Sequence, residues 1–112
     1  MAYDEELANR VRELVGREAG LTEQRMFGGL AMLVNRNMAV AVRSDSVGGL
    51  LVRVDPDRDD EALAEPGAAL MVMRGREMPG WITVTAEAVA RKADLRRWVD
   101  RGLTYARSLP AK

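Results

Sequence analysis

Five consecutive residues, Arg25-Met26-Phe27-Gly28-Gly29, form the segment of this sequence best suited to binding a ligand. Two glycines expose backbone N–H groups, and an arginine can hold a carboxylate or a phosphate through two parallel hydrogen bonds. A structural interpretation is favoured over this one: a tight connection between strands where only glycine fits, with Met26 and Phe27 in the core. No glycine-rich nucleotide-binding pattern surrounds the segment, which argues against a phosphate loop.

Two further residues could contribute to a binding surface. Arg53 lies within an apolar strand segment, where it would either face solvent or form a buried ion pair. If Arg25 and Arg53 reached the same side of a sheet, they would form an anion site. Trp81 follows the loop at residues 74–80, and at such a junction its ring could anchor a protein partner.

Catalytic and metal-binding chemistry has few side chains available in this chain. It contains neither histidine nor cysteine, so the commonest general base, the commonest metal ligand and the thiolate nucleophile are missing. The acidic run at residues 55–61 begins like a calcium loop, but its sixth position is Asp60 instead of glycine and its twelfth is Pro66 instead of glutamate. We therefore expect no enzymatic activity, no catalytic residue, no metal site and no cofactor.

The last expected helix is the most basic part of the chain. Residues 91–107 contain six basic side chains against Asp94 and Asp100. Arg97 and Arg101 are one turn apart and share a face, so they could contact a DNA backbone. The favoured interpretation is a solvated helix face, because 17 basic and 17 acidic residues cancel and no net field attracts nucleic acid. Nucleic-acid binding is therefore the alternative function.

The elements that must position these residues follow from hydrophobic spacing. Residues 4–19 are expected to form an amphipathic helix ending at Gly20, because apolar side chains recur on one face of a 3.6-residue period. A short acidic helix is expected at residues 57–65. The last helix is expected to open at Leu95, with Asp94 as its cap, and to end at Leu109-Pro110.

Short apolar segments bounded by glycine, proline and asparagine predict a sheet. Residues 21–27 could be a first strand. The other expected strands are residues 30–34, 38–43, 50–54, 70–73 and 81–84. We expect a single α+β domain over residues 1–112 with the order α-β(3)-α-β(2)-α, in which helices cover one face of an antiparallel sheet in two layers. The expected core is Leu7, Val11, Leu14, Val40, Val42, Val52, Val54, Ile82, Trp98 and Val99.

The segment at residues 25–29, placed after an amphipathic helix, resembles the Arg-Met-Phe-Gly-Gly signature of TfoX (Sxy) N-terminal domains. Three later segments fit the same pattern: residues 51–55, 75–81 and 94–99. The resemblance covers roughly residues 4–108. It implies a two-layer fold of the type seen in secretion chaperones, with the same α-β(3)-α-β(2)-α order.

The resemblance also implies a class of function. Named members of the family are associated with the regulation of natural competence and DNA uptake, together with a global transcription activator. This sequence ends at Lys112, without the helical C-terminal domain of full-length competence regulators, so we expect a stand-alone N-terminal domain.

The expected function is a non-enzymatic module that binds a protein partner, or a second copy of itself as a homodimer. We expect the cytoplasm as its location, because the chain has no cysteine, no apolar run long enough to span a membrane and an acidic N-terminus.

Overall fold

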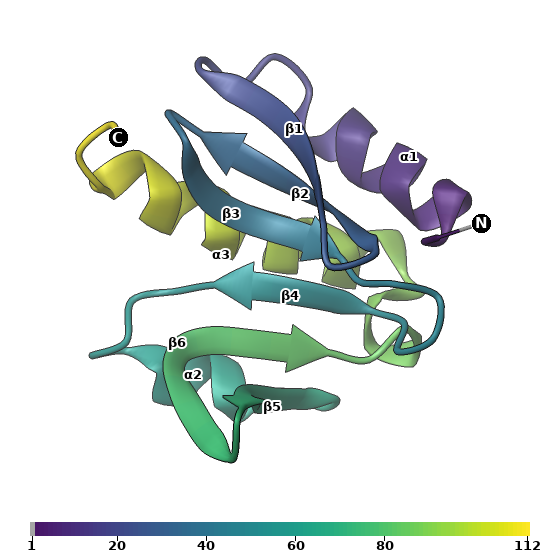
Figure 1. The fold of residues 1–112 in the computed structure, drawn as a ribbon, viewed down its shortest axis with the longest axis vertical. Coiled ribbons are helices and arrows are strands. Elements are labelled where there is room, and N and C mark those ends of the chain that lie inside the picture. Colours follow the sequence, from purple (N-terminus) through teal and green to yellow (C-terminus); the bar gives the residue numbers. More distant parts are fainter. Residues whose placement is uncertain (1) are drawn as a thin grey trace.

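Six antiparallel strands form one sheet in the computed structural model, which describes residues 2–112. The strands lie in the order β1-β2-β3-β4-β6-β5 (Figure 1). Their bounds are β1 (Leu21–Met26), β2 (Gly29–Val34), β3 (Asn37–Val42), β4 (Leu50–Arg53), β5 (Ala68–Met73) and β6 (Arg76–Val84). Residues 21–26 are thus a strand, and four strands precede the second helix instead of the three in the expected order.

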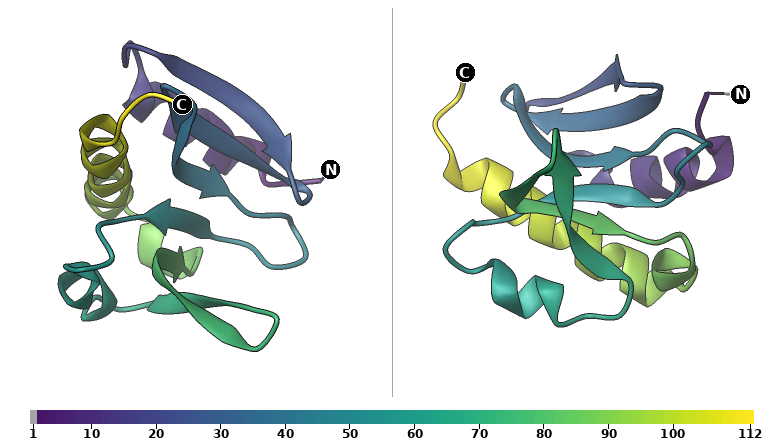
Figure 2. Two further views of the ribbon diagram at one scale, coloured as in Figure 1. Left: turned by 60° about the vertical axis from the view of Figure 1, so that its left-hand side comes forward. Right: turned by 60° about the horizontal axis from the view of Figure 1, so that its bottom comes forward.

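Two long helices, α1 (Glu5–Val15) and α3 (Lys92–Ser108), lie on the same side of the sheet. Figure 2 shows α3 crossing behind the central strands, with α1 beside it. The short helix α2 (Asp59–Leu63) packs near β5 and β6, and a 3-10 turn at Glu87–Val89 precedes α3. The expected two-layer α+β class is confirmed. None of the helices in the described residues is long and apolar enough to cross a membrane.

Both long helices have ends that differ from those expected. The first helix ends at Val15, because Gly16 adopts a φ of 48° and donates its N–H to the Arg12 carbonyl, 3.0 Å away. Gly20 is therefore not the stop. The last helix begins at Lys92, which places Asp94 within the first turn instead of at the cap. Its expected end at Leu109 is confirmed.

Three hairpins have turns of the same kind, in which both central residues take positive φ. Such turns match the right-handed twist of the strands that they join. The central pairs are Phe27-Gly28, Asn35-Arg36 and Arg74-Gly75. The expected loop at residues 74–80 is therefore only a two-residue turn.

The strand β6 starts at Arg76 and continues through Pro79 and Gly80. A register shift interrupts its pairing with β5 there, since Leu70 pairs with Ile82 but Met71 pairs with Met78. Gly80, with a φ of 84°, lets the strand bend at this point. The far end of the β5–β6 hairpin consequently leaves the plane of the sheet, as Figure 2 shows.

The core fills the space between the sheet and the two long helices. Of the ten expected core residues, only Leu14 is half-buried and the other nine are buried, so the alternation along the strands identified the helix-facing side correctly. Gly102 allows α3 to approach β3, because a Cβ atom at this position would overlap the carbonyl oxygen of Ala39. At the end of α3, the side-chain amide of the buried Asn37 donates to the Pro110 carbonyl, 2.9 Å away.

Candidate functional site around the first hairpin

The segment at residues 25–29 forms the turn between β1 and β2. Met26 pairs with Gly29 across the hairpin, and Phe27 and Gly28 are its two central residues. A Cβ atom at Gly29 would overlap the carbonyl oxygen of Val42, so this position requires glycine. The interpretation as a tight strand connection is confirmed in its geometry. Its expectation of a core Phe27 is wrong, because 87% of that residue is exposed at the tip of the turn, and Met26 is only half-buried.

Arg25 and Arg53 lie on strands that are not neighbours in the sheet. Arg25 stands opposite Leu30, a core residue, and is therefore on the helix side. Glu23, two residues earlier, confirms this side through its ion pair with Arg12 of α1, 2.8 Å long. Arg53 lies in β4, and β2 and β3 separate that strand from β1. The anion site expected from this pair of arginines is not formed.

Arg53 and Trp81 are instead partners of each other. They stand opposite one another between β4 and β6, and the guanidinium carbon of Arg53 lies 5.0 Å from the centroid of the Trp81 ring. The same carbon is 5.6 Å from the ring of Tyr105 in α3. Trp81 is half-buried. A cation between two aromatic rings is stabilised by both, so this cluster has a structural role.

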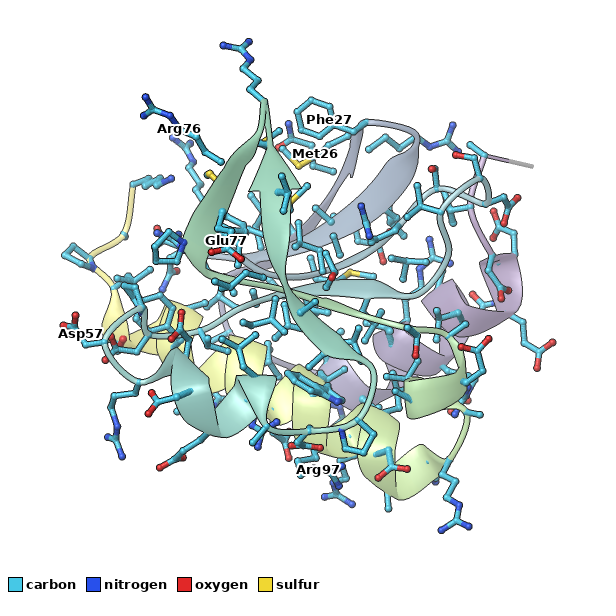
Figure 3. All side chains as sticks on the ribbon, turned by 90° about the horizontal axis from the view of Figure 1, so that it is seen from below. Met26, Phe27, Asp57, Arg76, Glu77 and Arg97 are labelled. Atoms are coloured by element: carbon cyan, nitrogen blue, oxygen red, sulfur yellow. The ribbon has the colours of Figure 1, made fainter. Side chains whose placement is uncertain are left out.

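A hollow of about 230 Å³ lies on the face of the sheet that the helices leave uncovered. Both hairpins border it: Met26 and Phe27 come from the first, and Met71 and Met73 come from the β5–β6 hairpin. Figure 3 shows Met26 and Phe27 on the side of the molecule away from α3. We call this site the open-face hollow. Its other lining residues are Gly29, Ala31, Met38, Ala41, Val42, Arg43, Ser44, Val47 and Leu51.

Most of the large apolar side chains exposed by the described residues lie around this hollow. The four exposed side chains are Phe27, Val47, Val72 and Met73. Phe27, Val47 and Met73 line the open-face hollow. Val72 lies between Met71 and Met73 in β5, so its side chain faces the other side of the strand. Single exposed apolar residues are ordinary, but a cluster around a concave site is typical of a surface that binds a partner.

Arg43 is the charged residue in the wall of the hollow. Its backbone is held in place, because its N–H donates to the Gly49 carbonyl at 3.0 Å. Burial lowers the pKa of its guanidinium from the ordinary value. Within residues 2–112, no carboxylate forms an ion pair with it. The hollow therefore combines apolar walls with one unpaired cation.

The two arginines considered for DNA contact are already engaged by carboxylates. Arg97 donates to Glu65 at 2.6 Å and to Asp94 at 2.8 Å. Arg101 pairs with the other oxygen of Glu65 and stacks on Trp98, with its guanidinium carbon 4.7 Å from the ring centroid. Hydrogen bonds from Arg97 hold the pKa of Glu65 below its usual value, although burial opposes the shift. These pairs weaken the case for a phosphate-binding face.

A second hollow, of about 790 Å³, lies beside these ion pairs along α3. Its walls carry both signs of charge, and its lining residues include Arg58, Arg96, Glu61 and Asp100. Such a mixture presents no single field to a polyanion.

Comparison with known protein families identifies the family of this chain. The family model described as the TfoX N-terminal domain matches residues 13–106. The chain belongs to the TfoX N-terminal domain family. No curated protein and no solved structure gives a significant match. The family match spans all the residues that line the open-face hollow. The TfoX N-terminal domain is not known as an enzymatic family.

Sequence reasoning identified the first hairpin but missed most of the residues around it. Arg43 immediately precedes the expected loop at residues 44–49, Val47 lies within that loop, and Met73 is the last residue of the expected strand at residues 70–73. Glu65, which engages Arg97 and Arg101, is separated from them by an entire hairpin. The one sequence signal for the residues around the hollow was the spacing of Met71 and Met73, which places both side chains on the same face of β5.

Proposed function

We propose that this TfoX N-terminal domain is a non-enzymatic regulatory module that binds a protein partner through the open-face hollow. One observation carries the proposal: three of the four large apolar side chains exposed by the described residues surround the same concave site. Water is displaced most favourably from such a surface when another apolar surface covers it.

The dimensions of the hollow support recognition of a side chain more than of a small molecule. A volume of about 230 Å³ is below the usual range for drug-sized ligands, roughly 300–1,000 Å³. It has room for one large side chain. Protein interfaces concentrate their binding energy in anchors of this kind, ringed by apolar contacts that exclude water. Phe27, on a rigid two-residue turn, would form part of that ring.

The family supports the regulatory part of the proposal. Its association with competence regulation and a transcription activator favours a domain that acts by contact with another protein. A link to transcription or competence, and a cytoplasmic location, belong to this proposal.

Nucleic-acid binding through α3 is the alternative, and the pairing of Arg97 and Arg101 with Glu65 disfavours it.

The test is recovery of the tagged protein from its native lysate, with and without nuclease. Phe27→Asn removes the exposed ring and keeps a residue that tolerates positive φ. Val72→Thr is the matched control, because it removes an exposed apolar group that faces away from the hollow. We expect a stoichiometric protein partner that survives nuclease with the wild type and with Val72→Thr, and is lost with Phe27→Asn.

Two results would contradict the proposal. In one, the partner remains bound to Phe27→Asn and also to Met73→Ser. In the other, everything that co-purifies disappears on nuclease treatment, which would favour contact through α3. Equal denaturation curves for wild type and Phe27→Asn would show that the loss is not a folding defect.

A further inference from the structure

We infer that the partner segment in the open-face hollow is an acidic peptide, with a carboxylate next to the large apolar side chain that enters the hollow. The inference rests on the proposed function and adds the chemistry of what is bound. It follows from the distribution of charge around the site.

Arg43 is the first part of the argument. Its side chain lines the hollow and is half-buried, yet no acidic group among the described residues pairs with it. A guanidinium in this position loses part of its hydration without gaining a counterion. A carboxylate from a bound peptide would supply two charge-assisted hydrogen bonds, which is the strongest pairing that arginine makes.

The β5–β6 hairpin carries two more cations close to Met73, which lines the hollow. Arg76 stands opposite Met73 and so shares its face of the hairpin, and Arg74 is a central residue of the turn. Both are exposed and without an ion pair in the part of the chain that the structure describes. Figure 3 shows Arg76 nearer the tip of the hairpin than Glu77. Glu77 stands opposite Val72 and therefore faces away from the hollow.

Four arginines on the helix side have carboxylate partners within this chain. Arg12 pairs with Glu23, Arg107 pairs with Glu18, and Glu65 holds two more. Carboxylates of this chain thus neutralise several cations beside the helices. Among the described residues, the cations Arg43, Arg74 and Arg76 are instead free to pair with another molecule. Asp45, exposed in the β3–β4 loop, is the nearby acid that a bound peptide would have to tolerate. Complementary charge of this kind sets orientation and specificity in an interface.

A second copy of this chain is a poor occupant through its most acidic segment. Its acidic run at residues 55–61 is partly used internally, because Asp59 accepts from the Gly80 N–H at 3.0 Å and Asp55 accepts from the Asp57 N–H at 2.9 Å. Leu63, the large apolar residue closest to this run, packs against the core. That acidic run therefore does not present a carboxylate beside a free apolar anchor.

The experiment is a selection of random displayed dodecapeptides on the immobilised full chain. The most enriched peptide is then labelled with fluorescein and titrated by anisotropy, alongside a copy in which its acidic residues are replaced by their amides. Proteins compared are the wild type, Arg43→Gln, Phe27→Asn and Arg58→Gln. Arg58 is an exposed arginine beside α2, away from the hollow, and serves as the matched control.

We expect enriched peptides to carry Asp or Glu beside Leu, Met, Phe or Trp. Arg43→Gln should weaken the acidic peptide about tenfold, as expected for a hydrogen bond between charged groups. It should leave the amide peptide unaffected, so that the two changes are coupled. Arg58→Gln should bind both peptides as the wild type does.

The inference is overturned if enriched peptides show no acidic preference, or if Arg43→Gln weakens both peptides equally. Binding that still depends on Phe27 in either case leaves the proposed function intact. Absence of any enriched peptide overturns the inference as well, and the lysate experiment then decides the proposed function separately. Phe27-dependent self-association in sedimentation would show that a second copy occupies the hollow instead.

Discussion

The guanidinium carbon of Arg53 lies 5.0 Å from the ring centroid of Trp81, directly across the ladder between β4 and β6. Tyr105 approaches the same guanidinium from α3. One cation thus links two strands of the sheet to the last helix. Both residues looked like binding residues in the sequence, and the contact between them explains each without a ligand.

Replacement of Arg53 by methionine should destabilise the fold. Methionine keeps the apolar stem but removes the charge that interacts with the two rings, an effect worth about 1 kcal/mol. The measurement is the free energy of unfolding in urea. Arg58→Met is the control, because Arg58 is exposed and has no such stack among the described residues. Equal stability of the two variants would show that the stack contributes nothing.

Glu65 should make the stability of the fold depend on pH. Its pKa is lower in the folded protein, chiefly because Arg97 donates hydrogen bonds to it. A carboxylate of this kind stabilises the fold above its unfolded pKa, about 4.3, and the contribution is lost as the pH falls through the lower folded pKa. Glu65→Gln should therefore be less stable at neutral pH and should lose less stability on acidification.

The measurement for Glu65 is the unfolding free energy from neutral pH to about pH 3. Glu13→Gln is the control, since Glu13 is exposed and makes no ion pair in residues 2–112. Parallel pH profiles for the wild type and Glu65→Gln would refute the assignment.

Gly29→Ala should destabilise the protein, whereas Arg25→Ala should not. The new Cβ atom would overlap the Val42 carbonyl oxygen and force β2 away from β3, at a cost of about 1–3 kcal/mol. Arg25 is exposed and without an ion pair in the described part of the chain. Thermal denaturation of both variants tests the contrast, and an unchanged midpoint for Gly29→Ala would argue against the close approach.

Gly102→Ala should destabilise the protein, whereas the same substitution in an exposed helix usually stabilises it. In an exposed helix, alanine is favoured over glycine by about 1 kcal/mol. Here the methyl group would overlap the Ala39 carbonyl oxygen and push α3 off the sheet. Thr104→Ala, at an exposed site of the same helix, should be stabilising or neutral. If urea denaturation showed Gly102→Ala to be as stable as Thr104→Ala, the helix would not be in contact with β3.

Much of the fold could be predicted because its signals are local. A 3.6-residue period identified α1 and α3, and alternation identified which side of β3 and β4 is buried. Element ends were harder to predict. Gly16 and Gly20 are both plausible helix stops, and only the positive φ with a returning hydrogen bond distinguishes Gly16.

The strand β6 was underestimated because Pro79 and Gly80 usually break a strand. Here they bend it, because β5 pairs with β6 before and after the bend, at Met78 and at Ile82. Whether proline ends a strand or bends it depends on partners that are distant in sequence.

By itself, the sequence determined the α+β class, the family, the helix-facing core and a tight, glycine-dependent connection between strands within residues 25–29. These depend on residue type and on spacing within one element. Only the tertiary structure decided that two strands separate Arg25 from Arg53, that Glu65 engages the arginines of α3, and that Phe27, Val47 and Met73 surround one hollow. The reason is physical: strand order, register and the bend in β6 arise from contacts between distant segments, and no local pattern encodes the distance between two side chains on different elements.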